Sequence, residues 1–186
     1  MMGQLKRNSN LSQPRTHRML TKTEIIIDSQ LNAEDRNQLN ILLQTCFLGI
    51  DFDNGPHATI RSILRFGNTI VAHAAASVRQ VDLRTSRVEL AVLGLVCVDQ
   101  RQRGSQLGYQ VIQALHNSLR MPFLLNCGRG LVPYYERIGY KEISSSASYL
   151  RNGMVVIDQD PVLLYGNGTF VSTEMRNGPI HMGTDF

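Results

Sequence analysis

The sequence predicts a mixed α/β domain, and three features of the chain indicate it. The apolar run Val88–Val98 lacks polar alternation, which is typical of a strand buried on both faces in the middle of a sheet. A turn rich in arginine and glycine follows, and it leads into apolar residues at helical spacing up to Leu119. Upstream, two strand-like segments meet at Gly67-Asn68, a hairpin signal. Hairpin strands combined with a strand–helix unit predict a sheet of mixed direction.

The length of the chain limits its organisation. At 186 residues it is long enough for one domain with a full core and too short for two. Residues 1–22 are polar, basic and without periodicity, which predicts a mobile tail; the domain is expected to span 23–170, with a C-terminal tail at 171–186. The net charge is +4, but much of the excess lies before residue 23, so no nucleic-acid partner is predicted.

The first half of the domain is expected to begin with a strand at Glu24–Asp28. A helix follows at Asn32–Phe47, where Asn32 is a suitable N-cap. The two hairpin strands, Ile60–Phe66 and Thr69–Leu83, then lead through a turn at 84–87 into the central strand. These three strands should form an antiparallel meander.

The second half should continue with a helix that makes a right-handed crossover to a parallel strand at Pro122–Cys127. A short helix at Leu131–Ile138 is expected to stop at Gly139. Further strands are expected at Tyr140–Ile143, Met154–Ile157 and Val162–Tyr165. The prediction is a sheet of six to seven strands with flanking helices.

The cysteines and the apolar runs indicate in which cellular compartment the protein is expected. The three cysteines, Cys46, Cys97 and Cys127, lie in apolar runs without pattern, which favours reduced core thiols over a disulfide framework. A nucleophilic cysteine is the sharper alternative, and the position of Cys97 in the middle of the buried strand argues against it. No apolar run reaches the roughly 20 residues needed to cross a bilayer, and none follows the basic N-terminus. A cytoplasmic location without a membrane partner is therefore expected.

The turn between the central strand and its helix, Arg103–Gly108, is a candidate phosphate site. The first N–H groups of a helix have no intrahelical partner, and the helix dipole favours negative charge there. Glycines let the main chain approach an anion closely, and arginines add charge-assisted hydrogen bonds. An ordinary strand–helix connection with solvated arginines is the alternative interpretation.

An acidic loop precedes the first hairpin strand. Asp51, Asp53 and His57 lie in it beside an Asn-Gly-Pro stretch. These side chains could line a substrate entrance or bind a metal, or they could serve turn formation alone. No metal site is predicted from them.

Two segments in order, VCVDQRQRGSQLG and PYYERIGY, together resemble the motifs of the GNAT superfamily of acyl-CoA-dependent N-acyltransferases. The segment VCVDQRQRGSQLG is similar to the superfamily's turn pattern Arg/Gln-x-x-Gly-x-Gly/Ala: Arg103 and Gly108 match its ends, and Gln106 stands where the middle glycine would be. The segment PYYERIGY matches the second pattern, aromatic-Tyr-x-x-x-Gly-aromatic. The resemblance extends from about Glu24 to Ile143. Within the superfamily, IVAHAAA and LGLVCV look most like the branch of aminoglycoside 2'-N-acetyltransferases and nodulation acyltransferases.

The resemblance implies a GNAT fold with acetyl-CoA as cofactor. The central strand and Pro122–Cys127 would splay apart at their carboxyl ends, and pantetheine would lie in the gap. Its amides would pair with main-chain groups that the splay leaves open. The residues implied in cofactor binding are Leu95, Val96, Val98, Arg103, Gly104, Ser105, Gln106, Leu107 and Gly108.

The resemblance also implies direct attack of a neutral amine on the thioester. Tyr135 is the candidate acid for the leaving thiolate, because a phenol with a pKa of about 10 stays protonated until needed; a packed helix residue is the alternative. Tyr134, next to it, is interpreted as core. Glu89 is a candidate base or a strand-end salt bridge. His73 could be the base or a structural histidine, and a water chain could replace both.

The implied reaction is transfer of an acetyl group from acetyl-CoA to a primary amine of a small molecule such as an aminosugar. An acidic mouth formed by Asp51, Asp53 and Glu174 would suit a cationic amine. The alternatives are a nodulation-type transferase with a longer acyl donor, where the basic balance would suit acyl carrier protein, and a non-catalytic acyl-CoA-binding module. A homodimer is compatible with each of them.

Overall fold

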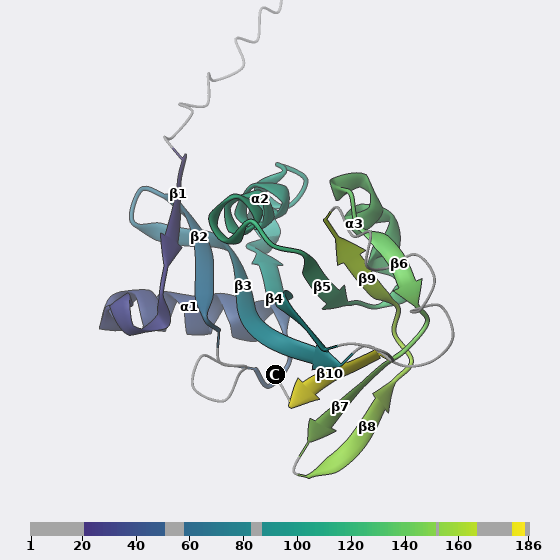
Figure 1. Cartoon of the computed structure of the whole chain (residues 1–186). Coiled ribbons are helices and arrows are strands. Elements are labelled where there is room, and N and C mark those ends of the chain that lie inside the picture. Colours follow the sequence, from purple (N-terminus) through teal and green to yellow (C-terminus); the bar gives the residue numbers. More distant parts are fainter. Residues whose placement is uncertain (1–20, 51–57, 83–86, 152, 167–179, 185–186) are drawn as a thin grey trace, which may run out of the picture.

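A computed structural model describes residues 21–50, 58–82, 87–151, 153–166 and 180–184 (Figure 1). The strands are β1 (Thr21–Ile26), β2 (Ile60–Phe66), β3 (Thr69–Asp82), β4 (Arg87–Val98), β5 (Phe123–Asn126), β6 (Lys141–Ser144), β7 (Ala147–Arg151), β8 (Met154–Asp158), β9 (Val162–Tyr165) and β10 (Ile180–Thr184). The helices are α1 (Ala33–Cys46), α2 (Leu107–Leu119) and α3 (Val132–Ile138), with the short 3-10 turns η1 (Asp28–Gln30), η2 (Gln100–Gln102) and η3 (Arg129–Leu131). The mixed α/β class predicted from the sequence is confirmed.

The local signals in the sequence account for these elements. Asn32 caps α1, and its side-chain oxygen accepts a hydrogen bond of 2.8 Å from the N–H of Asp35. The hairpin between β2 and β3 turns at Gly67, whose φ is +58°. β3 then pairs antiparallel with β4, so the predicted meander is present.

The two central strands are joined for only a short distance. β4 pairs in parallel with β5 at Ala91↔Phe123 and Val92↔Leu124. Beyond these two pairs, β4 continues to Val98 along β3. β5, which is paired with β9 over its whole length, has no further pair with β4. The strands therefore separate toward their carboxyl ends, as the resemblance to the GNAT superfamily implied.

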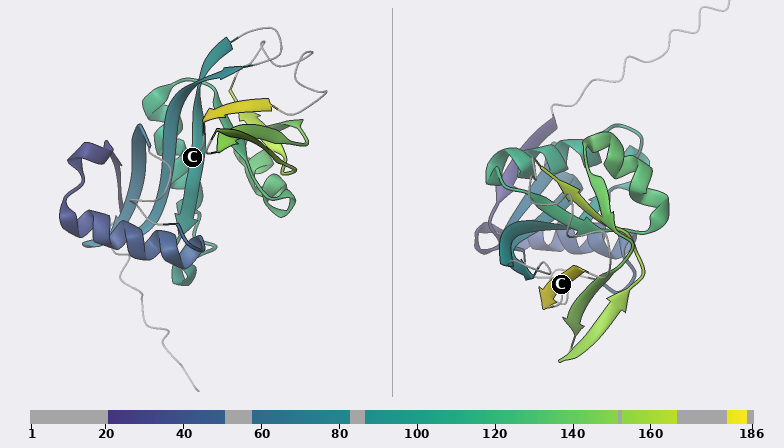
Figure 2. Two further views of the ribbon diagram at one scale, coloured as in Figure 1. Left: turned by 90° about the horizontal axis from the view of Figure 1, so that it is seen from below. Right: turned by 45° about the vertical axis from the view of Figure 1, so that its right-hand side comes forward.

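The sheet has a core on both faces. Residues of α2 and α3 pack with one face of β2 to β5, while α1 packs with the other face of β2 to β4, as Figure 2 shows. A third cluster lies between β4, β5 and β9 and the added strands β7 and β10. Four central strands thus carry apolar residues on both faces, which explains their continuous apolar character.

The sheet contains ten strands in the described residues, more than the six to seven predicted. β7 and β10 lack a clear apolar signal, and β10 lies within the segment 171–186 that the sequence assigned to a tail. Both are held by partners distant along the chain: β10 pairs in parallel with β7 and at His181↔Asp82 with β3. The buried side chains of Ile180 and Met182 anchor β10 in the third cluster.

The N-terminal boundary and the helix lengths complete the fold. Thr21 already belongs to β1, while residues 1–20 of the expected tail lie outside the described part of the chain. None of the helices in the described ranges is long and apolar enough to cross a membrane.

Candidate functional site

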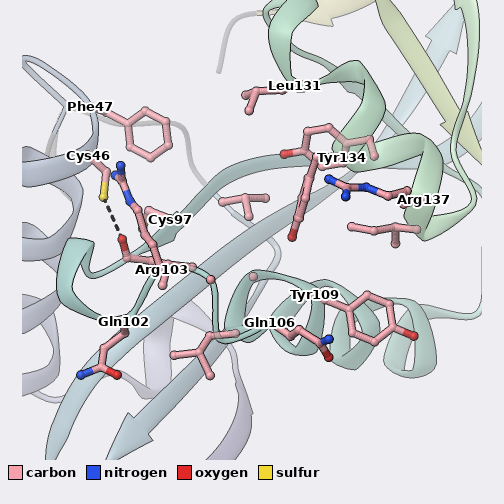
Figure 3. A pocket seen from close by; sticks show the side chains of 17 residues that line it. Cys46, Phe47, Cys97, Gln102, Arg103, Gln106, Tyr109, Leu131, Tyr134 and Arg137 are labelled. Atoms are coloured by element: carbon pink, nitrogen blue, oxygen red, sulfur yellow. Dashed lines mark hydrogen bonds between the residues drawn. The ribbon is translucent and has the colours of Figure 1, made fainter.

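A cavity of about 760 Å³ opens where β4 and β5 separate. Its walls come from the end of α1, the carboxyl end of β4, the turn that leads into α2, and α3. Figure 3 shows Cys46 and Arg103 on one side of it and Tyr134 and Arg137 on the other. The lining residues are Cys46, Phe47, Val96, Cys97, Val98, Gln102, Arg103, Gly104, Gln106, Leu107, Gly108, Tyr109, Leu131, Tyr134, Tyr135, Arg137 and Ile138.

A β-bulge in β4 shapes the floor of the pocket. Leu95 has a φ of +52°, and the register with β3 shifts between the pairs His73↔Cys97 and Ala75↔Gly94. Because the bulge inserts one residue, Val96 and Val98 join the core cluster that also contains Leu93. A left-handed leucine costs about 1 kcal/mol, so this backbone must be held by its surroundings.

His73 holds the bulge from the neighbouring strand. Its Nδ1 lies 2.9 Å from the carbonyl oxygen of Leu95, and its Nε2 lies 3.1 Å from Nη1 of Arg61. Since the guanidinium can only donate, Nε2 is the acceptor and Nδ1–H donates to Leu95. Burial and then the charge of Arg61 lower the pKa of His73 to about 3, so the ring is neutral.

This arrangement decides between the two interpretations of His73. Its side chain is fully buried, both ring nitrogens are engaged, and it does not line the pocket. His73 is therefore a structural histidine, and its contribution to the site is the position of the Leu95 carbonyl.

The turn that enters α2 presents its backbone to the pocket. Asp99 starts η2 by accepting a 2.8 Å hydrogen bond from the N–H of Arg101. Gly104 and Gln106 then adopt left-handed conformations with φ of +83° and +60°. Gln106 is the N-cap residue of α2 but makes no side-chain capping hydrogen bond. The turn therefore has the features of an anion site: an open helix N-terminus beside the Arg103 guanidinium.

The position of Gln106 gives the departure from the superfamily pattern a physical meaning. The pattern has a glycine there, and the backbone conformation is one that favours glycine. The glutamine adopts it at a cost of about 1 kcal/mol.

Gly108 brings α2 and α3 into close contact. A Cβ at this position would lie 2.8 Å from the hydroxyl oxygen of Tyr134 and 3.5 Å from Cγ2 of Val98. The missing side chain lets the Tyr134 hydroxyl reach the first turn of α2. Tyr134, predicted to be core, packs against the core cluster while partly exposed, and it also lines the pocket.

Tyr135 lines the pocket from α3 with only 7% of its surface exposed. Burial raises its pKa above the ordinary value, and the neighbouring Cys127 and Tyr134 add to the effect. Its ring makes edge contacts with Tyr134 and Tyr140, at centroid distances of 5.1 and 5.6 Å. The hydroxyl is therefore protonated at neutral pH, as a proton donor must be.

An aromatic cluster behind α3 supports these tyrosines. His116 of α2 stacks on Tyr165 with a centroid distance of 3.8 Å, and its Nε2 lies 2.9 Å from the hydroxyl oxygen of Tyr140. Burial lowers the pKa of His116 to about 4, so the ring is neutral at physiological pH. α3 ends at Gly139, whose φ is +106°, and its missing side chain leaves room for Tyr165, since a Cβ there would lie 3.2 Å from the Tyr165 ring.

The predicted cofactor residues lie together with few exceptions. Of the nine, all but Leu95 and Ser105 line the pocket; Leu95 lies in the bulge, and its carbonyl oxygen faces His73. The two predicted catalytic residues, Tyr135 and Glu89, do not lie together. Tyr135 lines the pocket, whereas Glu89 is exposed near the beginning of β4, accepts a 3.3 Å hydrogen bond from Gln80 and does not line the pocket.

Several predictions about the entrance lie beyond the described part of the chain. Asp51, Asp53 and His57 of the acidic loop and Glu174 all belong to segments outside the described residues. Within the ranges that the structure describes, no group of three or more His, Cys, Asp and Glu side chains is arranged to hold a metal ion.

Sequence reasoning missed other lining residues. Arg137 and Ile138 belong to the PYYERIGY motif, so the motif itself was a signal for them. Cys46 and Phe47 come from the end of α1, and only the tertiary packing of α1 against β4 brings them to the pocket. No local pattern in the sequence marks that contact.

Comparison with known proteins gives a family match and a fold match. The model of a family described as Nodulation protein A (NodA) matches residues 25–161. No curated protein matches the sequence.

Solved structures resemble the chain over most of its length. Escherichia coli ElaA is 17% identical with a TM-score of 0.59, covering 79% of this chain and 100% of its own. An acyl-CoA N-acyltransferase from Pseudomonas aeruginosa is 17% identical with a TM-score of 0.58 and the same coverage. The GNAT family N-acetyltransferase YhbS from Escherichia coli, solved in complex with CoA, is 13% identical with a TM-score of 0.55 and covers 87% of this chain and 88% of its own. The GNAT fold predicted from the two motifs is confirmed.

Proposed function

The chain belongs to the nodulation protein A family of GNAT-type acyl-CoA N-acyltransferases, and we propose that it moves an acyl group longer than acetyl from a thioester donor to the primary amine of an aminosugar. The observation that carries the proposal is the pocket in the splay, because it joins an open helix N-terminus to an apolar cleft that contains a buried tyrosine. The helix N-terminus would suit the anionic phosphates of a cofactor, and the apolar cleft would suit its uncharged thioester.

The residues present fit coenzyme A. The Arg103 guanidinium and the N–H groups of the turn up to Gly108 would bind the pyrophosphate. Val96 and Val98 lie on the edge of β4 that β5 leaves unpaired, so their main-chain groups would pair with the pantetheine amides. The bound cofactor supplies the acyl group as a thioester, with a thiolate as leaving group.

Tyr135 is proposed as the acid of the reaction. The amine nitrogen attacks the carbonyl carbon, the carbon–sulfur bond breaks, and the Tyr135 hydroxyl gives its proton to the departing sulfur. No carboxylate is present in the described lining of the pocket, so we propose that the amine loses its proton to water rather than to Glu89.

The proposed length of the acyl group follows from the rim of the pocket and from the family. Phe47, Leu131 and Ile138 line the cavity, and Leu131 is 53% exposed. Such apolar surface would be covered by an acyl chain, whereas an acetyl group would leave it in water. Acetyl-CoA, predicted from the superfamily resemblance, is the alternative donor.

The acceptor proposal keeps the acidic mouth predicted from the sequence. Asp51, Asp53 and Glu174 are proposed to attract a cationic amine to the entrance. Exchange of Asp51 and Asp53 for asparagine should then raise the KM for the amine and leave the KM for the donor unchanged.

Release of free thiol tests the function directly. Acyl-CoA donors from acetyl to palmitoyl are offered with a panel of amines that contains aminosugars, their N-acetylated forms and aminoglycosides. We expect amine-dependent thiol release that increases with acyl length and is absent with N-acetylated sugars. Binding of CoA without thiol release from any donor would favour the non-catalytic module, and absence of CoA binding in calorimetry would overturn the proposal.

A further inference from the structure

Two of the three cysteines meet in the wall of the pocket. Cys46 is the last residue of α1, and Cys97 lies on β4 just after the bulge. Both line the cavity, and each thiol shifts the pKa of the other, downward for Cys46 and upward for Cys97. The Sγ of Cys46 also lies 3.7 Å from the carbonyl oxygen of Val98 (Figure 3). The third cysteine, Cys127, lies elsewhere, at the end of β5.

The surroundings of the two thiols differ in charge and in access. Cys46 is partly exposed, and its pKa is lowered: the contact with Cys97 is the largest cause, and the Arg103 guanidinium adds to it. Cys97 is 4% exposed, and its Sγ lies 3.9 Å from Nδ1 of the neutral His73. The contact with Cys46, together with burial, raises the pKa of Cys97, although the Arg61 charge acts in the opposite direction. Cys46 is therefore the thiol that ionises and the one that reagents reach first.

We propose that Cys46 and Cys97 form a reversible disulfide that regulates the affinity of the pocket for its anionic donor through Arg103. A nucleophilic thiolate beside a positive charge, with a second thiol next to it, is the arrangement of a peroxide-sensitive pair. It lies in the pocket wall, so a change in its charge acts on a ligand there.

The chemistry of the pair balances with hydrogen peroxide as oxidant. The Cys46 thiolate attacks one peroxide oxygen, the O–O bond breaks, and Cys46 becomes a sulfenic acid as hydroxide leaves and takes a proton. The Cys97 sulfur then attacks Sγ of Cys46, the S–O bond breaks, and water leaves. In sum two thiols lose two electrons and two protons, and one peroxide becomes two waters. A thiol reductant reverses the change.

Arg103 links the pair to the donor. In the reduced protein the Arg103 guanidinium lowers the pKa of Cys46, and the negative charge of a Cys46 thiolate would repel the donor phosphates that use the same guanidinium. The disulfide is neutral, so oxidation frees Arg103 and removes the repulsion. The oxidised protein should bind the donor about fivefold more tightly, the effect expected for one partly exposed charge. This step depends on the proposed function, whereas formation of the disulfide does not.

The disulfide is tested by peroxide treatment of the full chain, followed by thiol counting and peptide mass spectrometry without reductant. We expect a Cys46–Cys97 linked peptide and retention of the Cys127 thiol. The Cys127→Ser variant should oxidise as the unchanged protein does, while Cys46→Ser and Cys97→Ala should form no intramolecular disulfide. Retention of all three thiols, a link that includes Cys127, or sulfinic acid at Cys46 without a link would overturn the proposal.

The effect on affinity is tested by calorimetry with desulfo-CoA, which has no thiol to exchange. The oxidised protein should bind about fivefold more tightly than the reduced protein, and Cys46→Ser should bind as tightly as the oxidised form with or without peroxide. Arg103→Gln should bind weakly and show no difference between the two redox states. Equal or weaker binding by the linked protein would overturn the regulatory role; absence of binding by every form would instead count against the proposed function.

Discussion

The two walls of the pocket are built in different ways. The wall around Arg103–Gln106 is an exposed turn that offers backbone N–H groups and one guanidinium. The opposite wall consists of the partly buried Tyr134 and the buried Tyr135 on α3, held by ring contacts that extend through Tyr140 to His116. One wall depends on main-chain direction, and the other on packed side chains.

This difference separates two kinds of effect. A wall of main-chain donors tolerates a change of side chain, which is why Gln106 can stand in a glycine position. A wall of packed aromatic rings transmits every change to the hydroxyl that it positions. Substitutions that displace the backbone of the turn should therefore change the affinity for the donor, whereas substitutions among the aromatic residues should change rate and stability.

The largest effect is expected from Tyr135→Phe, which removes the proposed acid and keeps the ring. The kcat should fall between about 100-fold and 10,000-fold, because the thiolate then leaves without a proton, while the affinity for desulfo-CoA should change less than about twofold. Thiol release under donor saturation measures the rate, and calorimetry measures the affinity. Tyr134→Phe is the matched control one position away. A larger loss of kcat in the control than in Tyr135→Phe would transfer the acid role to Tyr134.

Prediction from the sequence succeeded where the determinants are local. The turn wall was predicted from the apolar run, the glycines and the following helix, and each of these depends on neighbours along the chain. The N-cap of α1 at Asn32 and the end of α3 at Gly139 are likewise determined by residues close together in the sequence. Such signals are readable because the conformation and the residue preference are properties of one short segment.

The features that sequence reasoning missed depend on distant contacts. Tyr134 was interpreted as core because a helix pattern does not reveal which partner the helix meets; the missing side chain of Gly108 draws its hydroxyl into the pocket. Cys46 reaches the pocket only through the docking of α1 on β4. β10 forms because β3 and β7 offer it pairing edges. None of these partners is adjacent in the sequence.

The second-largest effect is expected from acid titration, which should lower the free energy of unfolding through His116 behind the aromatic wall. The pKa of His116 is lowered to about 4 in the folded protein, against about 6.5 in the unfolded chain. Between these values the unfolded state binds a proton that the folded state does not, so the free energy of unfolding falls as the pH falls, by about 3 kcal/mol in total. His73, with a pKa of about 3, acts in the same direction.

The variant His116→Gln isolates the first of these two histidines. Urea unfolding between about pH 6.5 and pH 4 should show a shallower loss of stability in the variant than in the unchanged protein, because one of the two buried imidazoles is gone. Identical slopes would mean that His116 is already protonated in the folded state. The affinity of the turn wall for desulfo-CoA at neutral pH should stay within about threefold of the original, since α2 begins well before residue 116.

Gly108→Val should affect both walls at once. The new Cβ would lie 2.8 Å from the Tyr134 hydroxyl oxygen, so the side chain of Tyr134, which lines the pocket, must shift. An overpacking cost of about 2 kcal/mol corresponds to a loss of donor affinity of about 30-fold. The double variant Gly108→Val with Tyr134→Phe lacks the clashing oxygen and should regain most of the affinity. If the double variant does not regain affinity, the valine lowers the affinity by displacing the N–H groups of the turn and not by displacing Tyr134 in the opposite wall.

The smallest effect is expected from Gln106→Gly, which restores the superfamily residue in the turn. At a φ of +60° glycine avoids the cost of a left-handed side chain, so the free energy of unfolding should rise by up to about 1 kcal/mol and the Tm by about 2 to 4 °C. Ser105→Gly is the control, because Ser105 is not among the residues with positive φ, and it should leave the Tm unchanged or lower it. Differential scanning calorimetry measures both. The affinity for desulfo-CoA should remain within about twofold, because the N–H groups keep their direction. A large loss of affinity would show that the Gln106 side chain itself binds the donor, and the turn wall would then depend on side chains as the aromatic wall does.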